Sequence, residues 1–218
     1  MRSAPWRATI LRTVVDDAIS AAASVGAPPT WVLSNHDVPR TVTRYSRSQP
    51  NGLVETDWER ARWAEEEADH ELGRRRARAC ALLQLALPGT AYIYQGEELG
   101  LEEVEDIPDE VRQDPTWVQS GFTDVGRDGC RVPLPWAAGE PGLGFGPTGK
   151  TWLPQPDSFA PLAADAQDGV EGSTLELYRS LLRLRHEREL GLGSLSFVED
   201  YADPDVLAQA GDVRQHRG

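Results

Sequence analysis

The sequence is poor in the residues that most often bind metals. Its 218 residues include two cysteines and four histidines, and no pair of them has the close spacing of a zinc site. We therefore predict neither a metal nor a cofactor. Cys80 lies in the apolar run 79–83 and is expected to be a small core residue. A disulfide between Cys80 and Cys130 is left open by the sequence.

Positive charge and long apolar runs are also scarce. The chain has 22 Lys and Arg against 35 Asp and Glu, a net charge of −13, which argues against a nucleic-acid partner. The one basic run, residues 74–76, lies in a helical pattern and is expected to be a solvated face. No apolar run approaches the roughly 20 residues of a membrane helix, and residues 1–6 lack the apolar core of a signal peptide. These absences predict a soluble, cytoplasmic protein that does not bind membranes.

The apolar periodicity predicts an α/β chain. Helical spacing of apolar residues predicts helices over 5–24, 69–87 and 174–189. Short apolar runs between turn residues predict buried strands at 31–33 and 91–94 and further strands at 195–198 and 206–208. Capping boxes predict helix starts at residues 56–59 and 173–176, and residues 41–56 are expected to be a polar loop.

Residues 101–170 differ from the rest of the chain in amino-acid composition and in apolar periodicity. They hold 9 of the 16 prolines, 9 of the 20 glycines and 3 of the 7 tryptophans, and they show no periodicity. Disordered segments are poor in aromatic residues. We therefore predict an ordered insert that packs over the carboxyl ends of the strands.

The first strand opens into a polar segment. Trp31, Val32 and Leu33 are followed by Ser34, Asn35, His36 and Asp37. In a β/α barrel, residues at the carboxyl end of a strand are placed to do chemistry. An ordinary turn is the alternative, because Asn and Asp are common turn formers.

Three segments give the chain a resemblance to a known family. They are NHDVPR at 35–40, LPGTAYIYQGEELG at 87–100 and GRDGCRVPLPW at 126–136. In order and spacing they resemble the C-terminal portion of α-glucosidases and oligo-1,6-glucosidases of the α-amylase family of glycoside hydrolases. The resemblance extends from residue 5 to about residue 200.

The resemblance implies part of a (β/α)8 TIM barrel. Residues 1–192 would supply helix six to helix eight of the catalytic barrel, with the insert 101–170 after strand eight. Residues 193–218 would begin an all-β C-terminal domain, a β-sandwich. The tail lacks the alternating pattern expected of such strands, so this second domain is expected to be truncated or divergent.

The resemblance also implies a chemistry. Family enzymes cleave α-glucosidic bonds with retention, which needs a nucleophile and a general acid/base on opposite sides of the bond. By motif, Asp37 is the third carboxylate, which stabilises the transition state, while His36 and Arg40 bind substrate. The nucleophile and acid/base of the family come from strands four and five, which are expected to precede residue 1. The chain alone is therefore expected to be inactive.

Other charged residues near these motifs have expected roles. Glu97 and Glu98 are expected to cap or anchor loops or to pair with Arg127 or Arg131, and Arg131 to hold the insert by an ion pair or to line the pocket. The remaining histidines are expected to be solvated or to lie in the tail.

The implied substrate is a small α-glucoside or a malto- or isomalto-oligosaccharide. Two other functions stay open. One is a transglycosylase or isomerase of the same family that forms trehalose or isomaltulose. The other is a non-catalytic sugar-binding remnant. The N-terminal part of the barrel is a further expected partner.

Overall fold

The computed structural model describes residues 7–47, 67–198 and 209–212. The strands are β1 (Thr30–Val32), β2 (Thr90–Tyr92), β3 (Ser194–Phe197) and β4 (Gln209–Asp212). The α-helices are α1 (Ala8–Ser24), α2 (Thr41–Ser46), α4 (His70–Ala86), α5 (Pro115–Gln119), α6 (Ala164–Gln167) and α7 (Thr174–Glu187). The 3-10 helices are η1 (Asp109–Val111), η2 (Asp128–Cys130), η3 (Pro141–Gly144), η4 (Asp157–Leu162) and η5 (Leu190–Leu192). The predicted strand 206–208 and the predicted helix start at 56–59 lie outside the described residues.

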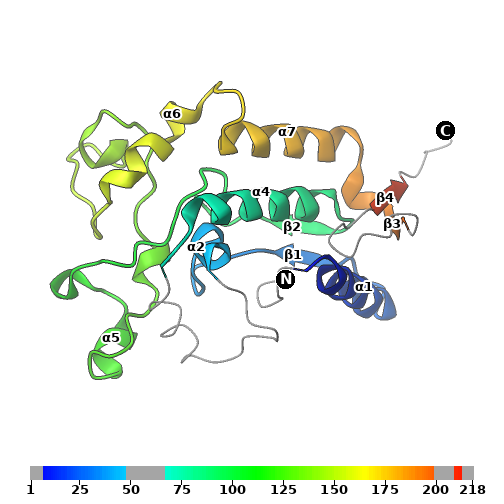
Figure 1. Ribbon diagram of the computed structural model, residues 1–218, viewed down its shortest axis with the longest axis horizontal. Helices are drawn as coiled ribbons and strands as arrows, with labels where there is room; N and C mark the ends of the chain where they lie inside the picture. Colours follow the sequence, from blue (N-terminus) through cyan, green and yellow to red (C-terminus); the bar gives the residue numbers. More distant parts are fainter. Residues whose placement is uncertain (1–6, 48–66, 199–208, 213–218) are drawn as a thin grey trace.

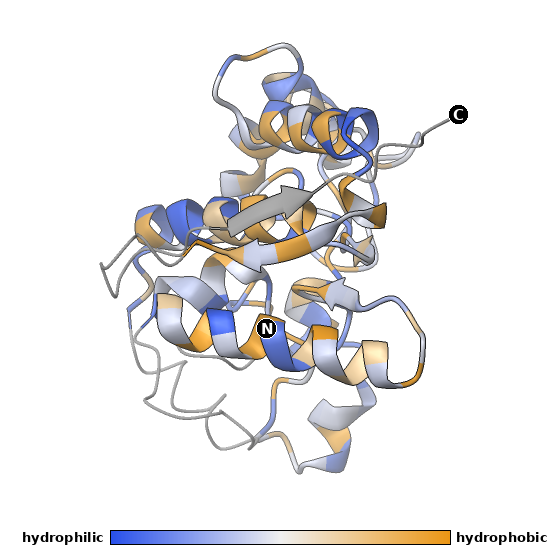
Figure 2. Cartoon of the chain, turned by 90° about the vertical axis from the view of Figure 1, so that its right-hand side faces the viewer, coloured by the Kyte–Doolittle hydropathy of each residue, from blue (hydrophilic) through white to orange (hydrophobic). Residues whose placement is uncertain are grey.

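A parallel pair of strands lies at the centre of the fold. β1 pairs with β2, with Thr30 opposite Thr90 and Val32 opposite Tyr92. Trp31 and Ala91 are paired, so their side chains point to the same face of the strands. Trp31 contacts α1, and Ala91 contacts α4 and α7, so the three long helices cover one face of the pair (Figures 1 and 2). Helices packed on parallel strands are the arrangement of α/β folds.

Apolar side chains join these layers. Val15 of α1 packs with Trp31 and Leu87, all three almost fully buried. Next to this cluster on the same face, Leu85 of α4 packs against Tyr178 of α7 and the strand residue Ala91. The predicted periodicities of α1, α4 and α7 are therefore confirmed, with bounds shifted by a few residues.

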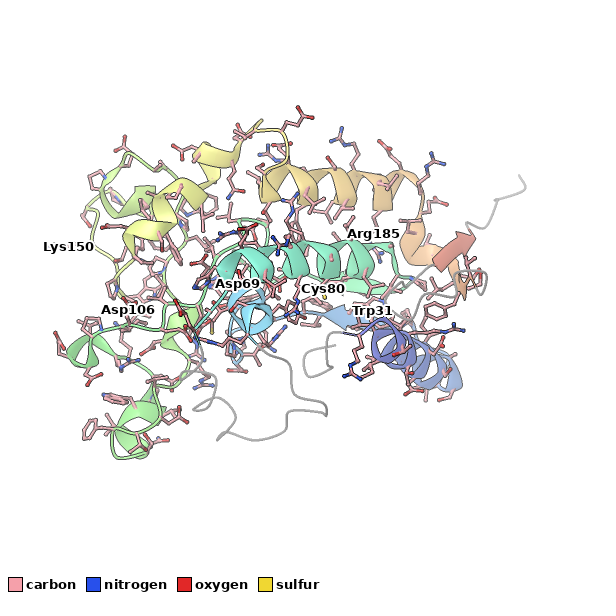
Figure 3. The ribbon with its side chains drawn as sticks, in the orientation of Figure 1. Trp31, Asp69, Cys80, Asp106, Lys150 and Arg185 are labelled. Carbon is pink, nitrogen blue, oxygen red and sulfur yellow. The ribbon has the colours of Figure 1, made fainter. Side chains whose placement is uncertain are left out.

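Two polar side chains fix the helices, one to the strands and one to the neighbouring helix. The Gln84 amide, which is fully buried in α4, donates hydrogen bonds to the carbonyls of Trp31 and Tyr92. It thereby joins α4 to both strands. Arg185 of α7, labelled in Figure 3, donates to the carbonyls of Leu85 and Leu87 at the end of α4. The carbonyls at a helix end have no partner within the helix, so this contact satisfies them.

The segment after β1 corrects the sequence-based prediction of a polar loop. Residues 41–46 form the helix α2, and all six are buried. The helix packs against α4 at Gly73, where an added Cβ atom would lie 2.2 Å from the carbonyl oxygen of Val42. The sequence of α2 has only Val42 and Tyr45 as large apolar residues, so periodicity could not reveal it.

The insert carries the largest group of buried apolar residues. The residues of this cluster pack together although they lie up to 60 positions apart in the chain. They are Leu99, Leu101, Val104, Ile107, Val132, Leu134, Leu153 and Phe159. The segment is therefore ordered, as its aromatic content indicates. Figure 1 shows it on one side of the strands, from α5 to α6, at the end to which β1 and β2 lead.

Side chains cap the helices α4 and α7. The Asp69 carboxylate accepts a hydrogen bond from Leu72 N at the start of α4, and the Ser173 hydroxyl accepts one from Glu176 N at the start of α7. The reciprocal half of the predicted capping box is absent there, because Glu176 instead accepts from Gly169 N.

The strand β2 departs from its predicted burial. Tyr92 is 59% exposed and Thr90 is also exposed, so β2 is not the buried strand that the sequence indicates. Among the described residues, β2 pairs only with β1 and its other edge is open. A hollow lined by Thr90, Ala91, Leu182 and Arg185 lies beside this edge.

Other predictions have clear outcomes. Cys80 and Cys130 are both buried free thiols, so no disulfide joins them. Cys80, labelled in Figure 3, packs with Leu33 and Tyr45 as a small core residue. No helix within the described ranges is long and apolar enough to cross a membrane.

Candidate active site

The site begins in the turn that follows β1. Asn35 accepts a hydrogen bond from Asp37 N through its side-chain oxygen, at 2.9 Å. This is the local bond by which Asn forms tight turns. Asn35 therefore has the turn role that the sequence left open, and the turn presents the Asp37 carboxylate, which is 44% exposed.

Two arginines of the insert hold Asp37. Arg127 Nη1 lies 2.8 Å from Asp37 Oδ1, and Arg131 Nη2 lies 3.3 Å from the same oxygen. Arg131 Nε also donates to the carbonyl of His36 at 3.0 Å. The turn after β1 and the insert after β2 are therefore joined through one carboxylate.

A buried carboxylate places these arginines. The side chain of Asp114 is fully buried and accepts from both Arg127 Nε, at 2.6 Å, and Arg127 N, at 2.9 Å. Arg131 Nη1 lies 3.7 Å from it. The buried Asp128 in turn accepts from the backbone N–H groups of Gln113 and Asp114. The insert thus has two carboxylates whose contacts set the direction of the arginines.

This pairing fixes the charges of the site. The hydrogen bond from Arg127 holds the pKa of Asp37 below its usual value and that of Asp114 well below it. The bonds to Asp114 and Asp37 raise the pKa of Arg127. Asp37 is therefore an anion at neutral pH, held in place and still half open to solvent.

His36 lies beside Asp37 and is the more exposed of the two. Its Nε2 is 3.4 Å from Asp37 Oδ2, and its side chain is 65% exposed. An imidazole N–H in this position can donate a hydrogen bond to a bound molecule.

Arg40 lies elsewhere than its predicted role requires. The side chain is 2% exposed, and its guanidinium donates to the carbonyls of Gln95 and Cys130. An arginine enclosed in this way ties the exits of both strands together and cannot touch a substrate in this arrangement. We therefore correct the substrate-binding prediction for Arg40 to a positioning role.

Glu97 and Glu98 anchor the exit of β2. Glu97 is 6% exposed and accepts from the Ser34 hydroxyl at 2.6 Å and from Tyr94 N at 3.3 Å, while Glu98 accepts from Gly96 N. The anchoring role is as expected, but neither pairs with Arg127 or Arg131. Burial raises the pKa of Glu97 to about 7.

Glu103 is a second partly buried carboxylate near the strand exits. It accepts from Arg40 N at 2.9 Å, and burial raises its pKa to about 7. His70, which was expected to be solvated, lies 3.4 Å from Glu102 and is about one third exposed. Among the described residues, neither Glu103 nor His70 makes a hydrogen bond or an ion pair with Asp37.

The sequence motifs do not indicate how two residues of the site are used. Arg127 begins the RDG motif, but the sequence indicates it only as a partner of Glu97 or Glu98, and no motif points to Asp114. Asp114 follows Gln113 in a segment without periodicity, so its pairing with Arg127 depends on the folded path of the insert.

The site shows no sign of a metal centre. In the part of the chain that the structure describes, no group of three His, Cys, Asp or Glu side chains could hold a metal ion.

Comparison with known proteins identifies the family. The model of the alpha amylase catalytic domain matches residues 4–192. A protein named "Probable alpha-glucosidase" from Rhizobium meliloti (strain 1021) is 38% identical over 170 residues, which are 78% of this chain and 26% of that protein. Maltase 1 from Drosophila virilis is 30% identical over 192 residues, 87% of this chain and 26% of that protein.

A solved structure agrees with these matches. The crystal structure of the alpha-glucosyl transfer enzyme XgtA is similar with a TM-score of 0.71 at 34% identity, over 94% of this chain and 33% of that one. The chain spans about a quarter of the length of the curated relatives that it matches. The three motifs, the fold and these matches agree, and the chain belongs to the alpha-amylase catalytic domain family, whose fold is an α/β TIM barrel.

Proposed function

We propose that this chain forms one wall of the active site of a retaining α-glucosidase that acts on short α-linked oligosaccharides. The observation that carries the proposal is the Asp37 carboxylate, held by Arg127 and Arg131 at the carboxyl end of the parallel strands. Functional sites of β/α barrels lie at that end. The hollow beside Thr90 lies at the other end of the strands and is not part of the proposed site.

Asp37 is suited to stabilise a transition state in which the sugar ring distorts. It is ionised, its position is fixed by two arginines, and nearly half of its side chain faces solvent. A fixed anion accepts hydrogen bonds from sugar hydroxyls without having to reorganise. If these bonds are stronger to the distorted ring than to the relaxed one, they lower the barrier. His36 would donate a further hydrogen bond to the same sugar.

The nucleophile and the acid/base are proposed to come from outside the described residues. Retaining cleavage needs two carboxyl groups about 5–5.5 Å apart, one on each side of the bond. Asp114 is fully buried and bound to Arg127, and Glu97 is buried against Ser34, so neither is free to attack a sugar. We propose that residues 1–192 supply helix six to helix eight of the barrel and that the remaining strands complete the site. The antiparallel pair β3 and β4 supports an all-β unit from residue 193 onward.

A binding experiment on the purified chain tests this role. Saturation-transfer NMR with methyl α-glucoside should detect binding that the Asp37→Asn variant loses. Asp16→Asn, on the exposed face of α1, is the matched control and should bind as the wild type does. Binding that survives Asp37→Asn unchanged would contradict the proposed site.

A turnover assay tests the division of labour. The purified chain should release no product from p-nitrophenyl α-glucoside, because the nucleophile is proposed to come from barrel strands that the described residues do not include. Turnover that Asp37→Asn abolishes would show that the chain carries a complete catalytic set.

Glucosyl transfer is the second candidate function. The similarity to an alpha-glucosyl transfer enzyme favours it, since transfer and retaining hydrolysis share the covalent intermediate and differ in the acceptor. Analysis of the products that the complete barrel forms from maltose and from sucrose separates the two. New disaccharides indicate transfer or isomerisation, and free glucose indicates hydrolysis.

A further inference from the structure

Trp152 presents an exposed indole on the insert, next to the proposed site. It is 51% exposed, although Leu153, which follows it, is almost fully buried in the core of the insert. Figure 3 shows Lys150, two residues earlier, at the outer end of the insert. A half-exposed tryptophan beside a fixed core residue has a ring that is anchored on one side and open on the other.

The indole is fixed in position by contacts on several sides. Its Nε1 donates to the carbonyl of Arg131 at 3.1 Å, and its own carbonyl accepts from Gln113 Nε2 at 2.6 Å. The ring of Phe145 meets it edge to face, with the centroids 5.0 Å apart and an interplanar angle of 86°. The ring therefore loses little conformational freedom when a ligand binds to it.

The same contacts connect Trp152 to Asp37. Arg131, whose carbonyl holds the indole, extends its guanidinium to Asp37 Oδ1. Gln113, which holds the Trp152 backbone, is itself held by Asp128 of the RDG motif. The indole and the carboxylate are thus hydrogen-bonded to the same residue, the indole to the Arg131 carbonyl and the carboxylate to the Arg131 guanidinium.

We propose that Trp152 is a stacking platform for a second sugar ring of the substrate, adjacent to the ring that Asp37 binds. The C–H groups on one face of a glucopyranose are apolar and slightly positive, and they complement the negative face of an indole. Sites of this kind combine aromatic surface with a few well-placed polar groups. Trp152 would then favour oligosaccharides over single glucosides. This inference rests on the proposed function.

The chain offers a matched control in Trp136. This residue lies in the same insert and is equally exposed, at 52%. Its backbone bonds to Leu143 and Asp165, whereas its indole makes no hydrogen bond to the described residues and none of its recorded contacts reaches Arg131. Trp136→Ala therefore removes an exposed indole without touching the proposed platform.

The test compares two sugars on the full chain by saturation-transfer NMR titration. Trp152→Ala should lower the affinity for maltotriose about tenfold and leave the affinity for methyl α-glucoside unchanged. Trp136→Ala should change neither affinity. Trp152→Phe keeps an aromatic face and should retain maltotriose binding within about threefold. The indole N–H signal that Trp152→Phe removes should shift with maltotriose and stay in place with methyl α-glucoside.

Several outcomes would overturn the platform while leaving the proposed function intact. One is that the wild type binds both sugars with equal affinity. Another is that Trp152→Ala and Trp136→Ala weaken maltotriose binding equally. The third is that Trp152→Ala lowers the melting temperature but leaves the ratio of the affinities for maltotriose and methyl α-glucoside unchanged. Loss of the proposed function has a different signature, which is methyl α-glucoside binding that does not depend on Asp37. A chain that binds neither sugar contradicts both.

Discussion

At the scale of single residues, the Asp114–Arg127 pair determines where the site's charges lie. A buried carboxylate holds the arginine from behind, and the arginine holds the half-exposed Asp37 in front. Asp114 therefore sets the position of Asp37 indirectly, because it contacts Arg127 and Arg127 contacts Asp37, the residue that would meet a substrate.

Asp114→Ala should therefore be costly. It leaves Arg127 and two backbone N–H groups without their partner, and loss of one member of a buried pair is strongly destabilising. We expect the free energy of unfolding to fall by about 3 kcal/mol, measured by urea titration. Asp168→Ala removes a carboxylate that pairs with Arg179 at the surface and is 64% exposed, and it should cost less than about 1 kcal/mol. Equal losses in the two variants would contradict the structural role of Asp114.

Glu97 predicts a pH dependence of stability. Its pKa is raised to about 7 in the folded chain, so between its ordinary value and pH 7 the folded state binds more protons than the unfolded state. Stability must then fall as pH rises through this range. We expect Glu97→Gln to lose about 2 kcal/mol less than the wild type between pH 5 and pH 7.5. Urea titrations at both values measure this.

The control for this pH dependence is Glu71→Gln. Glu71 is 77% exposed and pairs with Arg75 on the surface of α4. That variant should keep the pH dependence of the wild type. A Glu97→Gln variant with an unchanged pH dependence would show that Glu97 does not titrate in this range.

At the scale of the elements, the close approach of α2 to α4 depends on Gly73. Alanine is the better helix former, so Gly73→Ala would stabilise a free helix. In the folded chain, however, the added Cβ would meet the Val42 carbonyl at 2.2 Å. Steric overlap of this size outweighs the gain in helix propensity.

We therefore expect Gly73→Ala to lower the free energy of unfolding by about 2 kcal/mol, measured by thermal and urea unfolding. Gly139→Ala is the control, since an added Cβ there meets nothing within 4 Å and the backbone needs no left-handed conformation. A Gly73→Ala variant as stable as the control would contradict the tight contact.

The sequence predicts the elements whose apolar residues have a strong periodicity. It does not predict features that depend on contacts between residues far apart in the chain. The three long helices and the two parallel strands follow from apolar spacing. By contrast, α2 is buried because α4 and the insert cover it, and Arg40 is buried because the carbonyls of Gln95 and Cys130 receive its guanidinium. The choice of Asp37 as a site residue rests on its motif and stays a prediction, and the sequence does not predict its pairing with Arg127, 90 residues away.

At the scale of the whole molecule, the described sheet is narrow and open. β2 pairs with β1 on one side, and its Tyr92 is 59% exposed. Unpaired strand edges are templates for pairing with other chains. In the complete barrel, we propose that the N-terminal strands cover this edge and the hollow beside Thr90.

The purified chain should therefore self-associate. We expect sedimentation velocity to show larger species as concentration rises. Tyr92→Lys places a charge at the open edge and should reduce association. Val25→Lys, at a residue that is 77% exposed after α1, should not. A wild type that stays monomeric as concentration rises would contradict this prediction.

The pairing of β1 with β2 has a consequence for synthesis in the cell. Thr90, which pairs with Thr30, lies sixty residues later in the chain and is therefore synthesised after it. At about 5–20 residues per second, a ribosome takes several seconds to add that length. During this interval Trp31 lacks the strand with which it pairs in the described sheet, and Gln84, which later bonds to its carbonyl, has not yet been made. The order of translation therefore makes β1 the part of the described sheet that is exposed longest to chaperones and to neighbouring nascent chains.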